Sequence, residues 1–308
     1  MKNNFPKNDS LFDNEEYNTI LNHYLRENYD RIWLKSMILK GRHTEDSCAT
    51  LITGSSYALN GIMESCWKNA TNCSMHSQDL YYDYLCAREI IDKGGRFQNC
   101  FIIMGYYTAF QDLSLSKISR ETVLREVYIP VLHDSRHWDI KPIHDKKTDG
   151  IEEQISIDFL LHQGTYYSDF KRRGTLYNFE GIKWFDLPEE RRIFYARKRV
   201  KDHMRLLSHK KSFAENCRLL RDYTGYLVKK EIHPVIVIPP LTEEYNSFVD
   251  SEMKRGMQEM LKYASPAADF YDFNVYTTFS KDFFMDTDHL NPSGAYRMSK
   301  QLVNSFGR

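Results

Sequence analysis

The chain has few cysteines, and none of them stands in a pattern typical of a metal site. Six occur among 308 residues without a Cys-x-x-Cys pair: Cys48, Cys66, Cys73, Cys86, Cys100 and Cys217. Most lie beside apolar residues in predicted strands or helices. We therefore predict buried free thiols in place of disulfides or a zinc site.

An excess of charge of one sign is also missing. The 42 Lys and Arg residues are balanced by 42 Asp and Glu residues, which excludes the basic footprint of a nucleic-acid-binding protein. No segment approaches the roughly 18 apolar residues of a transmembrane helix. The segment 1–10 lacks the apolar core of a signal peptide. We expect a cytoplasmic protein with neither nucleic-acid nor integral-membrane partners.

Repeats, low-complexity tracts and linkers rich in proline or glycine are absent as well. Residues 1–308 are therefore expected to form a single domain. The chain also has neither a Walker A loop nor a Gly-x-Gly-x-x-Gly fingerprint, so no nucleotide cofactor is expected.

Short apolar runs and amphipathic segments do alternate along the chain. Runs without polar alternation predict buried strands at 48–53, 71–75, 100–105, 233–240 and 269–273. Apolar residues at three- and four-residue spacing predict helices over 15–39, 57–67, 80–92, 212–230, 247–263 and from 292 onward. This order predicts an α/β fold, a three-layer sandwich around a parallel sheet of about five strands.

Residues 113–211 depart from this alternation. They are polar, aromatic and rich in predicted helix, with long loops. We interpret them as an insertion that caps the carboxyl edge of the sheet, where open α/β folds place their sites.

A serine stands where the first predicted strand ends. Gly54-Ser55-Ser56-Tyr57 follows the apolar run, at the expected start of a helix. A tight turn there exposes a hydroxyl and places helix amides beside it, which suits a nucleophile such as Ser56. The alternative is that Ser55 or Ser56 only caps the helix.

An acid and a histidine stand three residues apart before the last predicted helix. Asp286 could orient His289, and His289 could then take the proton of Ser56. The alternative is a solvated loop in which Asp288 or Asn291 caps that helix. The order Ser, Asp, His is compatible with a catalytic triad, because triads are defined by geometry.

These segments resemble the SGNH (GDSL-type) hydrolase superfamily. Gly54-Ser55-Ser56-Tyr57 is similar to its first block, with Ser in place of Asp, and the segment 286–294 is similar to its last. The segment 77–83, Ser-Gln-Asp-Leu-Tyr-Tyr-Asp, is similar to members found with cell-surface polysaccharide and teichoic-acid modification. The resemblance implies an SGNH/flavodoxin-like sheet and leaves 113–211 unexplained.

The resemblance also implies an oxyanion hole, where the chain departs from the family pattern. The family's glycine amide is replaced by that of Ser77, beside the amide of Ser56. Its asparagine donor is absent, and Tyr106 or Tyr107 stands in its place. Losing one such donor costs roughly 3 kcal/mol of transition-state stabilisation, which favours a transferase or a degenerate member over an efficient hydrolase.

The expected function is serine-dependent acyl transfer on an ester, as an esterase or O-acyltransferase acting on an O-acylated glycan or its precursor. Acyl-CoA is a possible co-substrate for the transferase, and no other cofactor is expected. The alternative is a catalytically inactive SGNH-like module that binds a glycan or a partner enzyme in surface-polysaccharide biosynthesis.

Two further clusters have ordinary explanations. His133 and His137 stand four residues apart, but no H-E-x-x-H pattern accompanies them, so we expect no metal and interpret them as polar residues of the insertion. The run 189–199 is basic enough to contact a phosphate, but a solvated helix face is the commoner explanation of such a run.

Overall fold

Five parallel strands form one sheet in the computed structural model, which describes residues 15–140, 146–161 and 183–306. The strands are β1 (Thr50–Gly54), β2 (Ala70–Asn72), β3 (Asn99–Ile103), β4 (His233–Ile238) and β5 (Asp269–Asp272). Their order, β2-β1-β3-β4-β5, is that of flavodoxin-like doubly wound sheets. The predicted α/β fold with a five-stranded parallel sheet is confirmed.

The register of the sheet explains its burial pattern. Ile52 of β1 lies opposite Asn72 of β2 and Phe101 of β3, and Phe101 lies opposite Val235 of β4. Every residue of β1 and β3 is buried, whereas β5 at the edge begins with exposed residues. Strands covered on both faces need apolar side chains on both, which is why these runs do not alternate.

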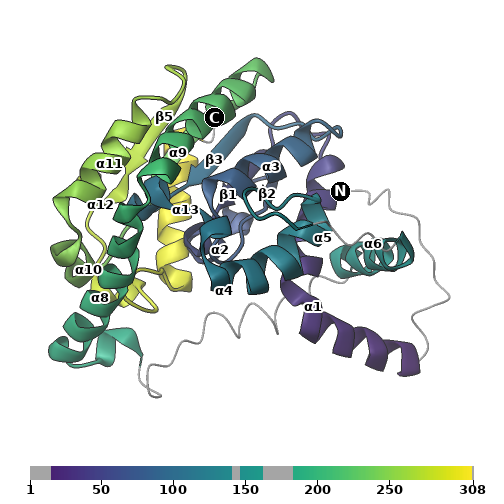
Figure 1. The fold of residues 1–308 in the computed structure, drawn as a ribbon, viewed down its shortest axis with the longest axis horizontal. Helices are drawn as coiled ribbons and strands as arrows, with labels where there is room; N and C mark the ends of the chain where they lie inside the picture. Colours follow the sequence, from purple (N-terminus) through teal and green to yellow (C-terminus); the bar gives the residue numbers. More distant parts are fainter. Residues whose placement is uncertain (1–14, 141–145, 162–182, 307–308) are drawn as a thin grey trace.

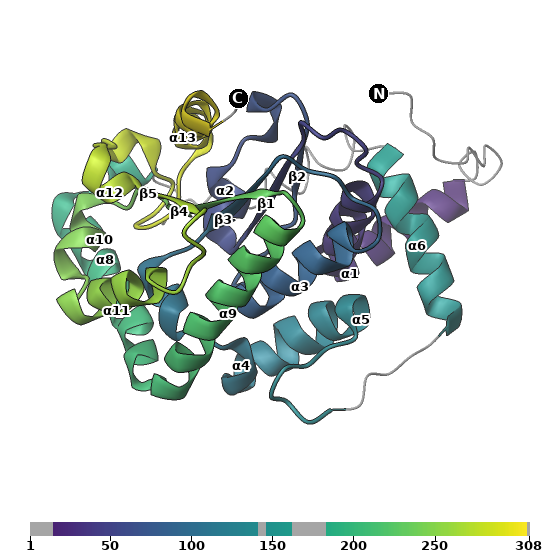
Figure 2. The same cartoon turned by 90° about the horizontal axis from the view of Figure 1, so that it is seen from above.

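Helices cover both faces of the sheet (Figures 1 and 2). The longer ones are α1 (Glu15–Arg42), α3 (Leu80–Ile91), α9 (Lys210–Lys229), α11 (Ser251–Leu261) and α13 (Pro292–Phe306). On one face, Tyr223 of α9 reaches the side chains of Thr53 and Cys100. On the other, Phe306 of α13 packs against Phe101. These contacts establish the three layers.

Short elements complete the core of the fold. They are α2 (Ser56–Gly61), η1 (Glu64–Cys66), η2 (Tyr106–Phe110), α10 (Glu243–Phe248), α12 (Phe273–Tyr276) and η7 (Lys281–Phe283). The helix predicted over 57–67 is shorter in the structure, because α2 ends at Gly61 and η1 is a separate short helix. The one predicted over 247–263 begins at Ser251, because Asp250 interrupts it and accepts the amide of Glu252 at 2.7 Å.

The described parts of 113–211 lie in two places. Their elements are η3 (Leu113–Leu115), α4 (Lys117–Ser119), the π-helix η4 (Arg120–Tyr128), α5 (Ile129–Leu132), α6 (Lys146–Leu161), η5 (Trp184–Asp186), α8 (Glu189–Met204) and η6 (Arg205–Ser208). The helices η4, α5 and α6 pack on α1. On the other side, α8 packs on α10, which follows β4, and η6 packs on η2, which follows β3, so these two elements approach the carboxyl edge of the sheet.

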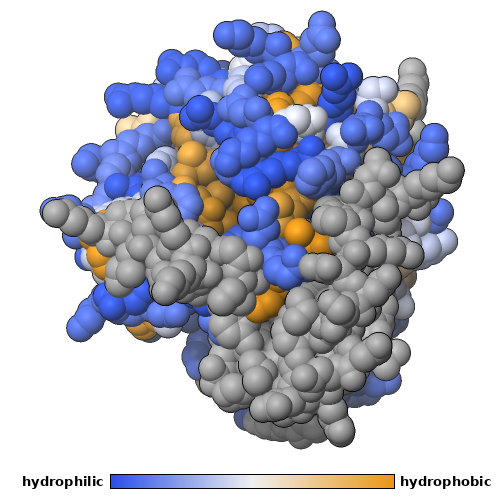
Figure 3. Space-filling model, turned by 90° about the vertical axis from the view of Figure 1, so that its right-hand side faces the viewer, coloured by the Kyte–Doolittle hydropathy of each residue, from blue (hydrophilic) through white to orange (hydrophobic). Residues whose placement is uncertain are grey.

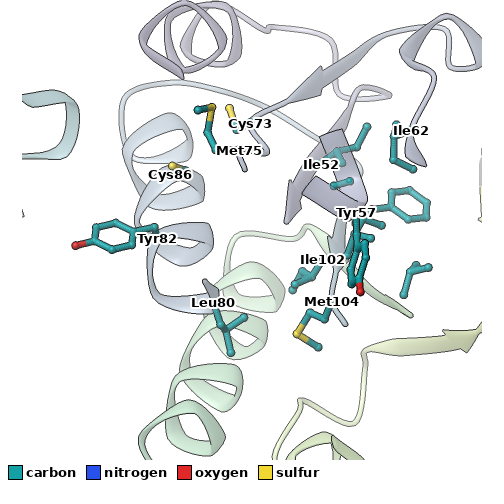
Figure 4. Packing of buried hydrophobic residues seen from close by; sticks show 14 of the residues in the cluster. Ile52, Tyr57, Ile62, Cys73, Met75, Leu80, Tyr82, Cys86, Ile102 and Met104 are labelled. Atoms are coloured by element: carbon teal, nitrogen blue, oxygen red, sulfur yellow. The ribbon is translucent and has the colours of Figure 1, made fainter. Parts of the chain in front are cut away.

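The core gathers between the sheet and these helices. Figure 4 shows Cys73, Met75 and Cys86 near α3. All six cysteines are free thiols, four of them buried, as the sequence predicts.

The outer surface is mixed in character. On the side that carries α1 and α6, apolar atoms show between polar side chains (Figure 3). Within the described ranges, no helix combines the length and the apolar character that a bilayer crossing requires.

Candidate active site

In the turn after β1, the two adjacent serines have different roles. Gly54 has φ +144°, and a Cβ there would stand 2.5 Å from the carbonyl oxygen of Ile103, so only glycine fits this close approach. Ser55 is the N-cap of α2, and its Oγ accepts the amide of Tyr57 at 3.4 Å. Ser56 is the first residue of the helix. Because Ser55 does the capping, the hydroxyl of Ser56 is left for another partner.

The loop before α13 is held by the side chain of Asp286. Its Oδ1 accepts the amides of Asp288 at 2.9 Å and His289 at 2.7 Å. The amide of Met285 donates to the carbonyl oxygen of His289 at 2.9 Å. These bonds hold the carboxylate of Asp286 on the same side of the loop as the imidazole of His289.

The cap of α13 is Asn291. Its Oδ1 accepts the amides of Ser293 and Gly294, each at 3.0 Å. Asp288, the other residue considered for this role, makes its side-chain contacts elsewhere. The acids of the loop are therefore not needed to begin the helix.

Ser56, His289 and Asp286 meet in a continuous chain of hydrogen bonds. Ser56 Oγ lies 2.8 Å from Nε2 of His289, although the two residues are 233 positions apart. On the other side of the ring, Nδ1 lies 2.9 Å from Oδ2 of Asp286 and 3.1 Å from its Oδ1. With its proton on Nδ1, the ring can accept the serine proton at Nε2.

The pKa values of His289 and Asp286 are shifted in opposite directions by their charged neighbours. Burial alone would lower the pKa of His289, but the carboxylates of Asp286 and Asp288 raise it above its ordinary value of 6.5. Burial would raise the pKa of Asp286, but His289 and two backbone amides outweigh it and lower the pKa. The ion pair therefore favours an ionised Asp286 and makes His289 a stronger base.

A second carboxylate beside His289 was not foreseen from the sequence. Asp288 is 2% exposed, and its Oδ1 lies 3.6 Å from Nδ1 of His289. Its Oδ2 accepts hydrogen bonds from the hydroxyl of Tyr57 and from Nε of Arg199, both at 2.9 Å. Arg199 comes from α8 and belongs to the basic run that we interpreted as a solvated helix face. The only sequence signal for it was that run.

A neutral histidine lies behind this network. The Nδ1 atom of His203 is hydrogen-bonded to the hydroxyl of Tyr245, and its ring lies 4.0 Å from that of Tyr107. Burial, helped by the charge of Arg199, lowers the pKa of His203 to about 3. His203 is therefore uncharged near neutral pH. The positive charge beside Asp288 is that of Arg199.

Asp286, Asp288 and His289 also present ligand atoms within 4.8 Å of one another, close enough to hold a metal ion. Their lone pairs and protons are already used, however. His289 contacts Ser56 and Asp286, and Asp288 accepts from Tyr57 and Arg199. This set suits proton transfer better than metal binding.

Two backbone amides near Ser56 have no acceptor. In the described part of the chain, neither the amide of Ser56 nor that of Ser77 donates a hydrogen bond. Ser77 has φ +60°, the left-handed conformation that glycine favours. Two residues before it, the amide of Met75 donates to the carbonyl oxygen of Gly54 at 3.2 Å, which brings the loop of Ser77 to the serine turn.

The two tyrosines differ in where their hydroxyls lie. Tyr106 donates to Oδ2 of Asp272 at 2.7 Å. There it lines a cavity of about 680 Å³ between the ends of β4 and β5 and α11, which is not lined by Ser56, Asp286 or His289. Tyr106 therefore leaves the set of oxyanion donors, because its only proton is used elsewhere. Tyr107 is buried beside Tyr57, with the two ring centroids 5.8 Å apart, so it stays near the serine turn.

Comparisons with known proteins add little. No protein-family model and no curated protein sequence matches the chain. A solved structure from Streptococcus pneumonia, provisionally described as a platelet activating factor, matches 95% of this chain and 99% of its own. The identity is 13% and the TM-score 0.40, a likeness too low to support any statement about activity.

Proposed function

We propose that the chain is a serine-dependent acyl-transfer enzyme that forms an acyl-enzyme on Ser56. The observation that carries this proposal is the 2.8 Å contact between Ser56 Oγ and Nε2 of a histidine whose Nδ1 is held by a carboxylate. A serine hydroxyl becomes a good nucleophile only when a base removes its proton. His289 is such a base, and Asp286 sets its tautomer and orientation.

The reaction follows from these positions. Ser56 Oγ attacks the acyl carbonyl while Nε2 of His289 takes its proton. The amides of Ser56 and Ser77 hold the oxyanion, with the hydroxyl of Tyr107 as the further donor of the set. His289 then protonates the leaving alcohol, and the acyl group remains on Ser56. A water or a sugar hydroxyl, deprotonated by His289, releases it.

The acceptor decides between esterase and O-acyltransferase. The resemblance of 54–57, 77–83 and 286–294 to proteins of surface-polysaccharide modification supports an O-acylated glycan, or its precursor, as the substrate class. Acyl-CoA would serve as the donor in the transferase, since attack of Ser56 on a thioester uses the same geometry.

A catalytically silent binding module is the second candidate. The engagement of Tyr106 with Asp272 favours it, because the site then offers fewer oxyanion donors than the family pattern. A missing donor costs roughly 10²- to 10³-fold in rate.

Labelling by a fluorophosphonate separates the two candidates, because the probe needs an activated serine but no knowledge of the substrate. We expect wild type to be labelled once, and Ser56→Ala not at all. Ser305→Ala changes an exposed serine of α13 and is the matched control that keeps labelling. Folded wild type that resists the probe would overturn the enzyme proposal.

Activity on model substrates then separates the two enzymes. An esterase releases acetate from acetylated sugars in water alone. A transferase releases CoA from acetyl-CoA faster when a sugar acceptor is added. Neither reaction should survive Ser56→Ala.

A further inference from the structure

A second cluster of ligating side chains lies outside the candidate active site. Asp112 follows η2, His137 follows α5, and Glu215 lies in α9. Nε2 of His137 lies 2.8 Å from Oε2 of Glu215 and 3.7 Å from Oδ2 of Asp112. The three ligand atoms lie within 4.8 Å of one another. An imidazole and two carboxylates from three separate segments thus face one point.

The carboxylate of Asp112 is incompletely satisfied. Asp112 is only 4% exposed. Its Oδ1 accepts the amide and hydroxyl of Ser114, but its Oδ2 is buried without a hydrogen-bond partner in the described ranges. That oxygen lies 3.7 Å from Nε2 of His137. A buried, unpaired carboxylate oxygen is costly, so this one needs a positive partner.

The local charge points to a cation of more than one charge. Arg136 lies against Asp79 at 2.9 Å, Asp112 at 3.4 Å and Glu215 at 3.9 Å. One guanidinium thus faces three carboxylates. The ammonium of Lys211 is 3.7 Å from Glu215 but 86% exposed, so water screens it. A divalent ion would balance the remaining charge.

We propose that Oδ2 of Asp112, Nε2 of His137 and Oε2 of Glu215 bind a divalent transition-metal ion, with zinc as the best fit. Zinc takes imidazole nitrogen and carboxylate oxygen at about 2.0–2.2 Å, which separates neighbouring tetrahedral ligand atoms by roughly 3.4 Å. The observed 2.8 and 3.7 Å lie on either side of that value. The imidazole favours zinc over magnesium or calcium, which prefer oxygen alone.

The site is open to solvent. A cavity of about 280 Å³ is lined by His137, Glu215, Tyr81, Arg136 and Arg218, and the side chain of His137 is 42% exposed. An ion can therefore enter from this cavity and keep a water as its fourth ligand. The cluster differs in this respect from the closed group around His289.

The ion would support the loop that carries Ser77. Gln111, next to Asp112, donates from Nε2 to the carbonyl oxygen of Ser77 at 3.0 Å. Arg136, next to His137, holds Asp79 at 2.9 Å. One ion would thus join α9 to both segments behind the candidate oxyanion loop. This positioning role rests on the proposed function, whereas the binding itself does not.

Metal binding can be measured without any substrate. We expect the full chain, freed of metal by a chelator, to bind one equivalent of Zn²⁺ in calorimetry. Co²⁺ should give visible absorption bands of a four- or five-coordinate ion, which Zn²⁺ abolishes. His137→Ala and Glu215→Gln should each weaken binding at least about tenfold. Added Mg²⁺ or Ca²⁺ should not compete.

His289→Ala is the matched control, because it removes a histidine from the other group of possible ligands, and it should bind Zn²⁺ as wild type does. His137→Gln, with its thermal unfolding measured in chelator, guards against misfolding of the alanine variant. Lack of saturable binding by folded wild type at millimolar Zn²⁺ would overturn the proposal, as would unchanged binding by both His137 variants. Loss of fluorophosphonate labelling alone would contradict the proposed function but not this site.

Discussion

The hydroxyl of Tyr57 donates a 2.9 Å hydrogen bond to Oδ2 of Asp288, and so connects the residue after the candidate nucleophile to the residue before the candidate base. The same oxygen accepts from Arg199 at 2.9 Å. The two walls of the site are therefore joined below the triad by a buried carboxylate with two donors. This carboxylate affects both the charge of His289 and the stability of the site.

Replacing Asp288 by Asn should shift the pH dependence of fluorophosphonate labelling at Ser56. His289 must be neutral to take the proton, so labelling of wild type rises with pH through a pKa above 6.5. The carboxylate of Asp288 contributes to that raised pKa. Without it, and with Arg199 still nearby, the pKa of His289 falls, and the acidic limb shifts to lower pH. The measurement is the rate of fluorophosphonate labelling between pH 5 and 9, a range set by the ordinary titration of histidine.

Tyr57→Phe is the control for this shift. It removes a donor to Asp288 but keeps the charge, so the acidic limb should stay in place or move slightly to higher pH. A limb that remains at the wild-type pH in Asp288→Asn would show that this carboxylate does not act on His289.

Removing the charge of Arg199 should destabilise the fold. Among the described residues, Arg199→Met leaves the side chain of Asp288 buried with Tyr57 as its one remaining hydrogen-bond donor. Breaking a fully buried pair costs about 3–5 kcal/mol, but the side chain of Arg199 is 38% exposed, so we expect about 1–2 kcal/mol. Urea unfolding measures the loss.

The double variant Arg199→Met with Asp288→Asn tests the cause. It removes both charges, so its loss of unfolding free energy should be smaller than the sum of the two single losses. Strict additivity would contradict a direct ion pair.

The same substitution at two glycines should have opposite effects. Gly54→Ala combines φ +144° with a Cβ 2.5 Å from a backbone oxygen, and we expect a loss of about 2 kcal/mol or more together with slower labelling of Ser56. At Gly225, which is exposed and lies toward the C-terminal end of α9, the Cβ of an alanine meets nothing within 4 Å. Gly225→Ala should stabilise by about 0.5–1 kcal/mol. Thermal or urea unfolding of both variants checks the signs.

Ser77→Gly separates the amide of that residue from its hydroxyl. Glycine adopts φ +60° without strain and keeps the N–H, so labelling should stay within about twofold of wild type, since an oxyanion donor is worth far more. A hundredfold loss would mean that the hydroxyl acts, and that the proposed oxyanion set is wrong.

The local features of the fold were predictable from the sequence. Uninterrupted apolar runs at 100–105 and 233–240 predicted β3 and β4, because strands buried on both faces need no polar side. The turn at Gly54 and the Asp-x-x-His spacing at 286–289 depend on neighbouring residues, so a single chain segment was enough to suggest them. The helix predicted over 57–67 was wrong at its end, since α2 ends at Gly61 and Glu64–Cys66 form the separate short helix η1.

Other features were decided only by the tertiary structure. Arg199 reaches Asp288 across 89 positions, Tyr106 donates a hydrogen bond to Asp272 on β5, and His137 faces Asp112 and Glu215 from another segment. Spacing and periodicity predict what lies within a few residues along the chain. Which charged groups share a buried space depends on how distant segments pack, and the cost of leaving a charge unpaired in that space then selects the partner.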